Sequence, residues 1–449
     1  MLRTFASLAI PNYRRYFAGQ VVSLTGNWMQ TVAEMWLVVQ LTGSGVSVGL
    51  TAALQFLPIM VFGAWGGLLA DRLAKRRLLL LTQSLMALPA LALWGLTASG
   101  SIEIWMVYAL VFVRGAVNAV DNPARQSFAI EMVGADRVVN AVALNSVIIH
   151  TARILGPAAA GAVIALVGVA TCFLINAVSF AAMLIALRAM DPRALHTPEP
   201  AARAAGQVRS ALRYVRRSPN LLIPLGMMAV IGTLSFNFQV LLPLLASITW
   251  DGTAALYTAL AVAMGVGSVA GALVTSARGR TGPRLLVGAA AAFGAAELLV
   301  AVAPTIELQL AALVPLGAVS VTFAAGVNSA LQLAVEPAMR GRVMALYSVV
   351  FLGSTPIGAP LVGWIAEVAG PRAGLLLGAV AALAAAAGAH AAFRRTRSRT
   401  ASSAIIAPHV EAEHLRRGRH GVDGECGGGG REHQRGSRAP VGREPVGSG

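Results

Sequence analysis

The chain has 449 residues, of which 56% are hydrophobic and 12% are charged, and its formal net charge is +16. A soluble protein of this size would carry about 25% charged residues, so the composition excludes an ordinary soluble domain. Two cysteines, Cys172 and Cys426, provide neither a disulfide framework nor a metal site, and we expect no metal and no cofactor.

Apolar stretches that are long enough to cross a bilayer recur along most of the chain. A spanning helix needs about 20 mostly apolar residues, and a backbone within lipid must satisfy its own hydrogen bonds, so helices are predicted. Arg14 and Arg15 lead into a first stretch that is too long for a cleavable signal. Twelve spans are predicted, at about 17–41, 47–70, 78–98, 104–124, 140–166, 170–189, 221–246, 255–277, 285–303, 308–332, 343–366 and 374–393.

Loops that are rich in arginine alternate with loops that carry almost no charge. If the N-terminus is cytoplasmic, the inner loops hold the basic runs 72–77 and 188–217, and Arg372 is the single basic residue of the outer loops. The positive-inside rule therefore predicts that both termini are cytoplasmic. Because the basic residues lie at the inner ends of spans, anionic lipid explains them, and no nucleic-acid partner is expected.

Composition predicts four parts. Residues 1–190 and 220–393 are expected to form two six-helix bundles, and residues 191–219 are a cytoplasmic linker that is rich in Pro, Ala and Arg. Within this linker Arg209, Arg213, Arg216 and Arg217 fall at helical spacing and predict an amphipathic helix on the membrane surface, with a solvated charged linker as the alternative. Residues 394–449 contain no aromatic side chain and are predicted to be a disordered cytoplasmic tail.

The two halves share a pattern of residues at one constant offset. The residues Ala143, Leu144, Ser146, Val147, Gly156, Gly161 and Gly168 recur as Ala345, Leu346, Ser348, Val349, Gly358, Gly363 and Gly370. Shared hydrophobicity does not account for repeated Gly and Ser, so a duplicated six-helix unit is predicted. Parallel halves of this kind enclose a site between them, near the middle of the bilayer.

The predicted inner loop between the second and third spans carries the sequence G-L-L-A-D-R-L-A-K-R-R at 67–77. It resembles the signature loop of the major facilitator superfamily. The resemblance implies a latch that holds the two halves together when the cytoplasmic side is closed. An alanine stands at 74, where the pattern often has Gly, and the equivalent loop of the second half lacks the acid, so the latch would be one-sided. The alternative is an ordinary positive-inside loop. The predicted latch residues are Gly67, Asp71, Arg72, Lys75 and Arg76.

Further motifs resemble one bacterial branch of that superfamily, which contains the enterobactin exporter and the macrolide efflux proteins. They are N-Y-R at 12–14, T-G-S at 42–44, D-N-P-A-R-Q at 121–126 and R-G-R-V-M at 340–344. The likeness covers residues 5 to about 393. It implies an all-α membrane protein of twelve transmembrane helices in two pseudo-symmetric bundles, located in the bacterial inner membrane and functional as a monomer.

The fifth predicted span carries Gly156, Pro157 and Gly161, which are similar to the antiporter signature of the superfamily. Proline removes one backbone donor and predicts a bend, and glycine allows close packing. Ala152 and Ala160 replace two glycines of the signature. The motif favours export, and an ordinary small-residue helix contact is the alternative.

Ionisable side chains within the predicted spans are the strongest functional pointer, because such residues normally face a cavity or one another. Glu34 is predicted to carry a proton, since movement relative to Arg114 or Arg153 would switch its protonation. The alternative is a permanent Glu–Arg ion pair that holds helices together. The residues predicted for proton coupling and a central cavity are Glu34, Arg114, Arg153, Gln30, Asn118, His150 and Glu297.

These features together predict a secondary active transporter that works by alternating access. We expect proton-coupled efflux of a small amphiphilic organic molecule, such as a drug or a siderophore-like metabolite, by an antiporter that confers drug resistance. A proton-coupled nutrient symporter and a transporter-like sensor or scaffold are the alternatives. The chain has no P-loop, nucleophile elbow or H-E-x-x-H pattern, so no enzyme is expected.

Overall fold

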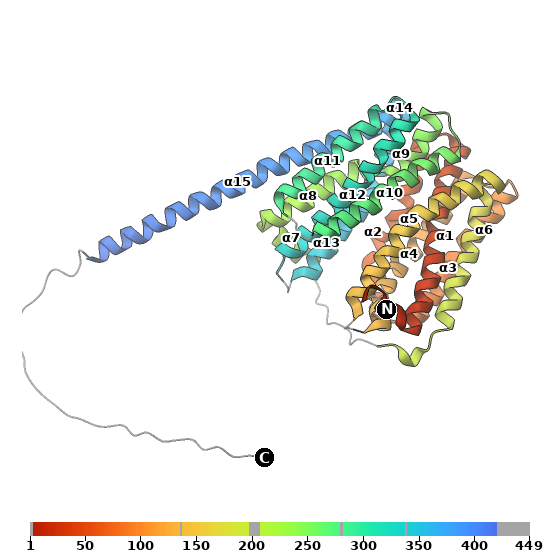
Figure 1. The fold of residues 1–449 in the computed structure, drawn as a ribbon, viewed down its shortest axis with the longest axis horizontal. Helices are drawn as coiled ribbons and strands as arrows, with labels where there is room; N and C mark the ends of the chain where they lie inside the picture. The colour runs from red at the N-terminus through yellow and green to blue at the C-terminus, as the bar shows by residue number, and fades with distance from the viewer. Residues whose placement is uncertain (1–2, 135–136, 197–206, 279–281, 337–338, 420–449) are drawn as a thin grey trace, which may run out of the picture. The chain divides into compact units, whose positions relative to one another are not determined.

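The structure is a computed structural model, and it describes residues 3–134, 137–196, 207–278, 282–336 and 339–419. Every regular element within these residues is a helix. The chain divides into two units, residues 1–394 and 395–449, and the helices of both predicted bundles lie in the first unit up to Arg394. Figure 1 shows α1 to α6 in red to yellow and the helices of the second half in green to blue.

The first half consists of one short 3₁₀ helix and six long helices. They are η1 (Arg3–Ala9), α1 (Pro11–Thr42), α2 (Gly45–Arg72), α3 (Lys75–Ala98), α4 (Ile104–Val133), α5 (Val138–Val167) and α6 (Val169–Arg188). Within this half α1 packs against α5 and α6, and α4 packs against α2 and α3.

Two short helices follow, and then the second half begins. The linker contains η3 (Pro192–Ala194) and α7 (Gln207–Arg217). The second half consists of α8 (Pro219–Leu234), α9 (Phe238–Leu244), the π-turn η4 (Leu245–Thr249), α10 (Ala254–Arg278), α11 (Pro283–Val302), α12 (Ile306–Ala334), α13 (Arg340–Gly353), α14 (Thr355–Ala369) and α15 (Pro371–Arg419). The helix α12 packs against α10, α11 and α8.

The described helices confirm the predicted all-α membrane fold. Eleven segments are long and apolar enough to span a bilayer, and two of them, α8 to η4 and α13 to α14, are broken helices. The helix α1 is the twelfth long helix, and at 1.5 Å per residue it is about 48 Å long. The polar side chains Ser23, Gln30 and Glu34, which are buried within α1, lower its hydropathy.

The sequence repeat has a structural counterpart. The helices α5 and α14 both end at a glycine in the left-handed region, Gly168 with φ 87° and Gly370 with φ 86°. The two halves therefore share not only residues but also the point at which equivalent helices stop, since L-residues with a Cβ rarely adopt such φ values.

Equivalent glycines also make equivalent contacts. A Cβ at Gly156 would overlap α1 at Trp28, and a Cβ at Gly358 would overlap the first helix of the second half at the Thr233 carbonyl. Each of these helices then contacts the opposite half: α5 packs on α10, and α14 packs on α2. The two halves are thus joined reciprocally, by one helix from each.

The contacts that join the halves gather toward one end of the bundle, which we name the Glu367 end. There Gly45 and Gly363 are so close that a Cβ on either would overlap the backbone of the other. Ser44 Oγ and the Val46 backbone N–H both donate to Glu367 Oε2, at 2.5 and 3.0 Å. The opposite end of the helices carries Arg72, and we name it the Arg72 end.

The helix α15 continues beyond the predicted boundary at residue 394, as far as Arg419. Alanine, arginine and glutamate favour helix, and the helix includes Pro408, which cannot donate a backbone hydrogen bond. The disorder predicted for the segment from Arg394 to Arg419 remains a prediction. Residues 420–449, which the same prediction includes, lie outside the described residues.

The helix α7 occupies the linker segment in which an amphipathic helix is predicted. Val215 is buried, while Arg213, Arg216 and Arg217 are exposed. The helix contacts α8 and α13, and Tyr214 Oη accepts a hydrogen bond from the Glu336 backbone N–H at 3.5 Å. Its predicted place on the membrane surface remains a prediction, and residues 197–206 of the linker lie outside the described residues.

Candidate functional site

A buried ion pair lies within the first half. Arg114 Nη2 on α4 is 2.5 Å from Glu34 Oε2 on α1, and the two side chains are 2% and 0% exposed. Charged groups this deep in a protein are stable only when they are paired and hydrogen-bonded. The sequence left open whether Arg114 or Arg153 is the partner of Glu34, and in the structure Arg114 contacts it.

Two amide side chains extend the pair into α6. Gln30 Nε2, one turn before Glu34, donates to Glu34 Oε1 at 2.7 Å. Asn176 Nδ2 in turn donates to Gln30 Oε1. Gly26 makes room for this network, because a Cβ there would overlap Asn176 and Ser179 on α6.

The direction of these hydrogen bonds determines the charge that the network favours. One carboxylate oxygen of Glu34 accepts from Arg114 and the other accepts from Gln30. Each amide points its N–H toward Glu34, and aligned donors strengthen one another in a low-dielectric interior. The network therefore stabilises ionised Glu34. Arg114 Nε has no hydrogen-bond partner in the described part of the chain, so one donor of the guanidinium is unused.

A second buried carboxylate lies in the same helix as Arg114. Asp121 is 0% exposed, and its Oδ2 is 2.7 Å from Arg125 Nε. Its Oδ1 accepts from Thr82 Oγ1 at 2.6 Å and from Gln83 Nε2 at 2.9 Å. The charged residues of α4 therefore have two separate sets of partners, since Arg114 contacts α1 and Asp121 contacts α3.

Three further predicted cavity residues form no hydrogen bond to the first network within the described residues. Arg153 on α5 lies over the Trp28 ring of α1, with 5.2 Å from Cζ to the ring centroid. Arg153 Nε and His150 Nδ1 have no hydrogen-bond partner within the described residues. Asn118 is half-buried, one turn after Arg114. Their predicted role in proton coupling remains a prediction.

The predicted bend motif lies in the middle of α5, which is continuous through Pro157. Gly156 packs against Trp28 of α1, and Gly161 packs against Thr258 of α10. Both glycines are thus used for close helix contacts, one within the half and one across the halves. The bend itself remains a prediction.

The predicted latch loop makes contacts inside the first half. Lys75 Nζ is 2.5 Å from Glu131 Oε1 on α4, and Arg76 donates to the Leu187 carbonyl of α6 at 2.7 Å. Asp71 and Arg72 are exposed. Gly67 is half-buried near the end of α2. A latch between the halves remains a prediction for another conformation of the protein.

Glu297 on α11 lies in a different cluster from Glu34. It is 0% exposed, and its carboxyl group lies against Gly378 of α15, where a Cβ would overlap it. Ser235, between α8 and α9, is its polar neighbour. The structure therefore does not join the two predicted carboxyl groups in one network.

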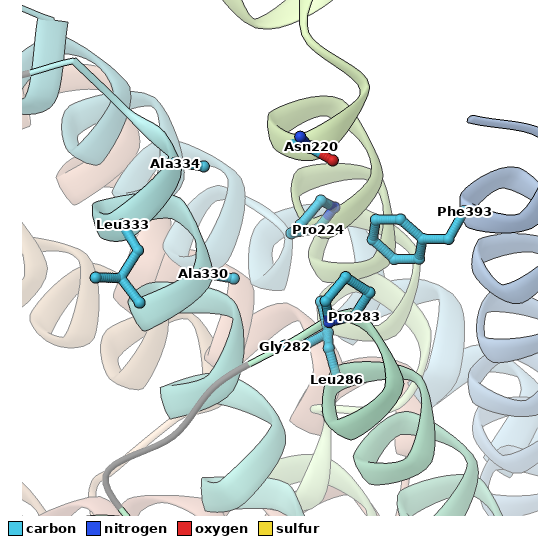
Figure 2. A pocket seen from close by; sticks show the side chains of 9 residues that line it. All are labelled: Asn220, Pro224, Gly282, Pro283, Leu286, Ala330, Leu333, Ala334 and Phe393. Carbon is cyan, nitrogen blue, oxygen red and sulfur yellow. The ribbon is translucent and has the colours of Figure 1, made fainter. Parts of the chain in front are cut away.

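Two pockets lie in the second half. Figure 2 shows the first, which has a volume of about 280 Å³ and lies between α8, α11, α12 and α15. Pro224, Leu286 and Phe393 line it, with Asn220 as its polar side chain. The second pocket has about 410 Å³ and lies between α10, α11 and α12. None of the predicted site residues lines either pocket.

Sequence reasoning missed partners that turn single charges into networks. Asn176 completes the chain to Glu34, Gln83 and Thr82 hold Asp121, and Glu131 holds Lys75. One signal could have found Asn176, since it is the one side-chain amide of its predicted span. The others needed the rotation of one helix relative to the next, which hydropathy does not determine.

The chain is similar to known membrane proteins along most of its length. Residues 2–422 match the family model described as transmembrane secretion effector. The staphyloferrin A transporter of Staphylococcus aureus is 25% identical over 261 residues, which cover 58% of this chain and 65% of that protein. The chain thus spans less than two thirds of this relative. The enterobactin exporter EntS of Citrobacter koseri is 26% identical over 376 residues, which cover 81% of this chain and 87% of that protein.

Among solved structures, the nucleoside transporter NupG superposes with a TM-score of 0.66 at 14% identity. The match covers 85% of this chain and 99% of that one. At this identity the likeness shows the fold alone.

Proposed function

Because the chain belongs to the transmembrane secretion effector family, within the major facilitator superfamily, we propose that this transporter exports small amphiphilic molecules in exchange for protons. It is a multi-pass membrane protein and not an enzyme. The proposed cargo is siderophore-like, with drugs as the second class. The relatives named above for enterobactin and staphyloferrin A support the cargo class.

The observation that carries ion coupling is the buried pair of Glu34 and Arg114. A proton that reaches Glu34 would remove its charge and end the charge-assisted bond to Arg114. The guanidinium would then be free to bind an anionic or hydroxyl group of the cargo. Proton and cargo would thus compete for one arginine, and such competition couples two fluxes in opposite directions.

The contacts at the Glu367 end suggest where the structure would lie in the proposed cycle. The positive-inside rule assigns the Arg72 end to the cytoplasm, so both termini would be cytoplasmic in the bacterial inner membrane. The end at which Gly45 meets Gly363 would then be the external one. In this orientation the structure corresponds to the conformation in which an exporter loads its cargo from the cytoplasm, by rocking of two halves within one chain.

The test is an accumulation screen in an efflux-deficient bacterial host, with catecholate and carboxylate siderophores and amphiphilic drugs. The wild-type protein should lower the accumulation of at least one compound, and collapse of the proton gradient should abolish the effect. Glu34→Gln should abolish it too, because the neutral amide cannot exchange a proton. Glu103→Gln is the matched control, since Glu103 is exposed and bonds to Trp105 on its own helix.

Inverted vesicles distinguish export from its alternative. Accumulation inside inverted vesicles with an acid interior supports export, whereas proton-driven uptake into right-side-out vesicles identifies a symporter. If Glu34→Gln transports normally at every pH and still moves protons, the pair is a structural ion pair. A screen in which no compound changes its accumulation contradicts the proposed cargo class.

A further inference from the structure

The second half contains one carboxyl group whose surroundings are opposite to those of Glu34. Glu297 is 0% exposed, and neither of its oxygens has a hydrogen bond within the described residues. Glu297 forms no ion pair with a basic side chain of the described residues. An ionised carboxylate without a partner in an apolar interior is very costly, and such a group takes up a proton instead.

The residues around Glu297 belong to α11, the α8–α9 break, α12 and α15. On its own helix, the neighbouring Phe293 packs against Phe236 of the α8–α9 break, with ring centroids 5.0 Å apart, and against Phe323 of α12 at 6.4 Å. From α15 the neighbour is Gly378. The basic residue at the start of α15, Arg372, instead donates to the Ala303 carbonyl at 2.8 Å and lies over Trp250.

The hydroxyl group of Ser235 offers no hydrogen bond to Glu297, because it donates its hydrogen elsewhere. Ser235 Oγ donates to the Gly378 carbonyl at 2.8 Å, which uses the single hydrogen of the hydroxyl. Ser235 therefore has no hydrogen left to donate to Glu297, and an ionised carboxylate can only accept hydrogen bonds. The arrangement of Ser235, Gly378 and Glu297 thus fits a neutral acid and does not fit a carboxylate.

The same residues lie at a break in a spanning helix. The helix α8 ends at Leu234 and α9 begins at Phe238. Asn237, within the break, is 2% exposed and donates to the Thr233 carbonyl at 2.7 Å, while its Oδ1 has no partner in the described residues. Breaks of this kind in transporters hold coupling ions and substrates.

The break is also in contact with the helix that joins the halves. Gly358 of α14 packs against Thr233, the residue two positions before Ser235. Five residues later, Gly363 of the same helix packs against Gly45 of α2. Movement between the halves at α2 and α14 is therefore transmitted through α14 to the residues beside Glu297.

We propose that Glu297 is a proton-binding site of the second half, occupied in this conformation, and that rearrangement of the α8–α9 break when the halves move releases its proton. This site is separate from Glu34 and does not depend on which cargo is transported. It would be a second exchangeable proton within the same chain.

Infrared difference spectroscopy of the full-length protein in lipid nanodiscs tests the protonation. The wild-type protein should show the carbonyl stretch of a protonated carboxyl group at neutral pH. Glu297→Gln should remove that band, while Glu34→Gln and Glu103→Gln should keep it. A wild-type protein without the band, or a band that survives Glu297→Gln, overturns the proposal.

A second variant tests the release. A Cβ at Gly49 would overlap the Ala359 backbone of α14, so Gly49→Leu should separate α2 from α14. We expect the band to disappear at a lower pH in this variant than in the wild-type protein. Gly63→Leu is the matched control on the same helix, since a Cβ at Gly63 has only Ile59 nearby, at 4.0 Å. If the band disappears at the same pH in both variants, the proposed link between Glu297 and the moving halves is overturned. Neither experiment measures transport, so failure here leaves the proposed export separately testable.

Discussion

The two halves share one repeat, yet they treat a buried carboxyl group in opposite ways. In the first half, two donors and a positive charge surround Glu34, so that its ionised form is stabilised. In the second half, an apolar wall and a hydroxyl that has already used its hydrogen surround Glu297, so that its neutral form is favoured. Duplication thus fixes the helix packing, and individual side chains then give each half its own electrostatics.

The largest expected effect tests this contrast directly. Glu34→Gln leaves Arg114 buried without a counter-charge, and this should lower the free energy of unfolding by about 3–5 kcal/mol. Glu297→Gln should cost less than about 1 kcal/mol, because a neutral amide of the same size replaces a neutral acid. Denaturant unfolding in detergent at neutral pH measures both. Equal losses for the two variants would contradict the opposite charge states.

A double substitution sharpens the first half of the contrast. Glu34→Gln combined with Arg114→Gln removes both charges, so the pair of changes should cost less than the sum of the two single changes by about 2 kcal/mol. The same unfolding assay gives the difference. If the cost of the double substitution equals the sum of the two single costs, the two side chains do not interact in the protein in detergent.

The shared packing of the halves predicts effects of intermediate size. Gly161→Val and Gly363→Val occupy equivalent positions and face α10 and α2 respectively, where a Cβ overlaps the neighbour. Each should cost about 1–3 kcal/mol, the usual range for overpacking, and Gly363→Val should cost more, because it meets the Gly45 backbone whereas Gly161→Val meets the Thr258 side chain. Gly226→Val is the control, because a Cβ there meets nothing within 4 Å. A loss for one glycine alone would break the equivalence.

The smallest expected effect concerns helix caps in the two halves. Ser44 caps α2 by accepting from the Ser47 N–H, and Thr305 caps α12 by accepting from the Leu308 N–H. Replacing either with Ala should cost about 1 kcal/mol. Ser44→Ala should cost slightly more, because Ser44 also donates to Glu367 across the halves. Thermal unfolding of the two variants in one detergent compares them, and a larger loss for Thr305→Ala would oppose that ordering.

The sequence was sufficient for the fold because lipid restricts the backbone to helices and hydropathy locates them. It also identified the buried ionisable groups, since charges inside spans are rare. It could not assign Glu34 to Arg114 rather than Arg153, because that choice depends on how α1, α4 and α5 are rotated about their axes. The break at Ser235 was likewise hidden within a continuous apolar run.

The place where Gly45 and Gly49 meet α14 has a mechanical consequence. Backbone lies directly on backbone at these two glycines, so neither has a side chain that must move when α2 separates from α14. Polar contacts such as the one between Ser44 and Glu367 then contribute to the barrier to opening. The speed of the cycle would accordingly be tunable at that contact without disturbing the interior of either bundle.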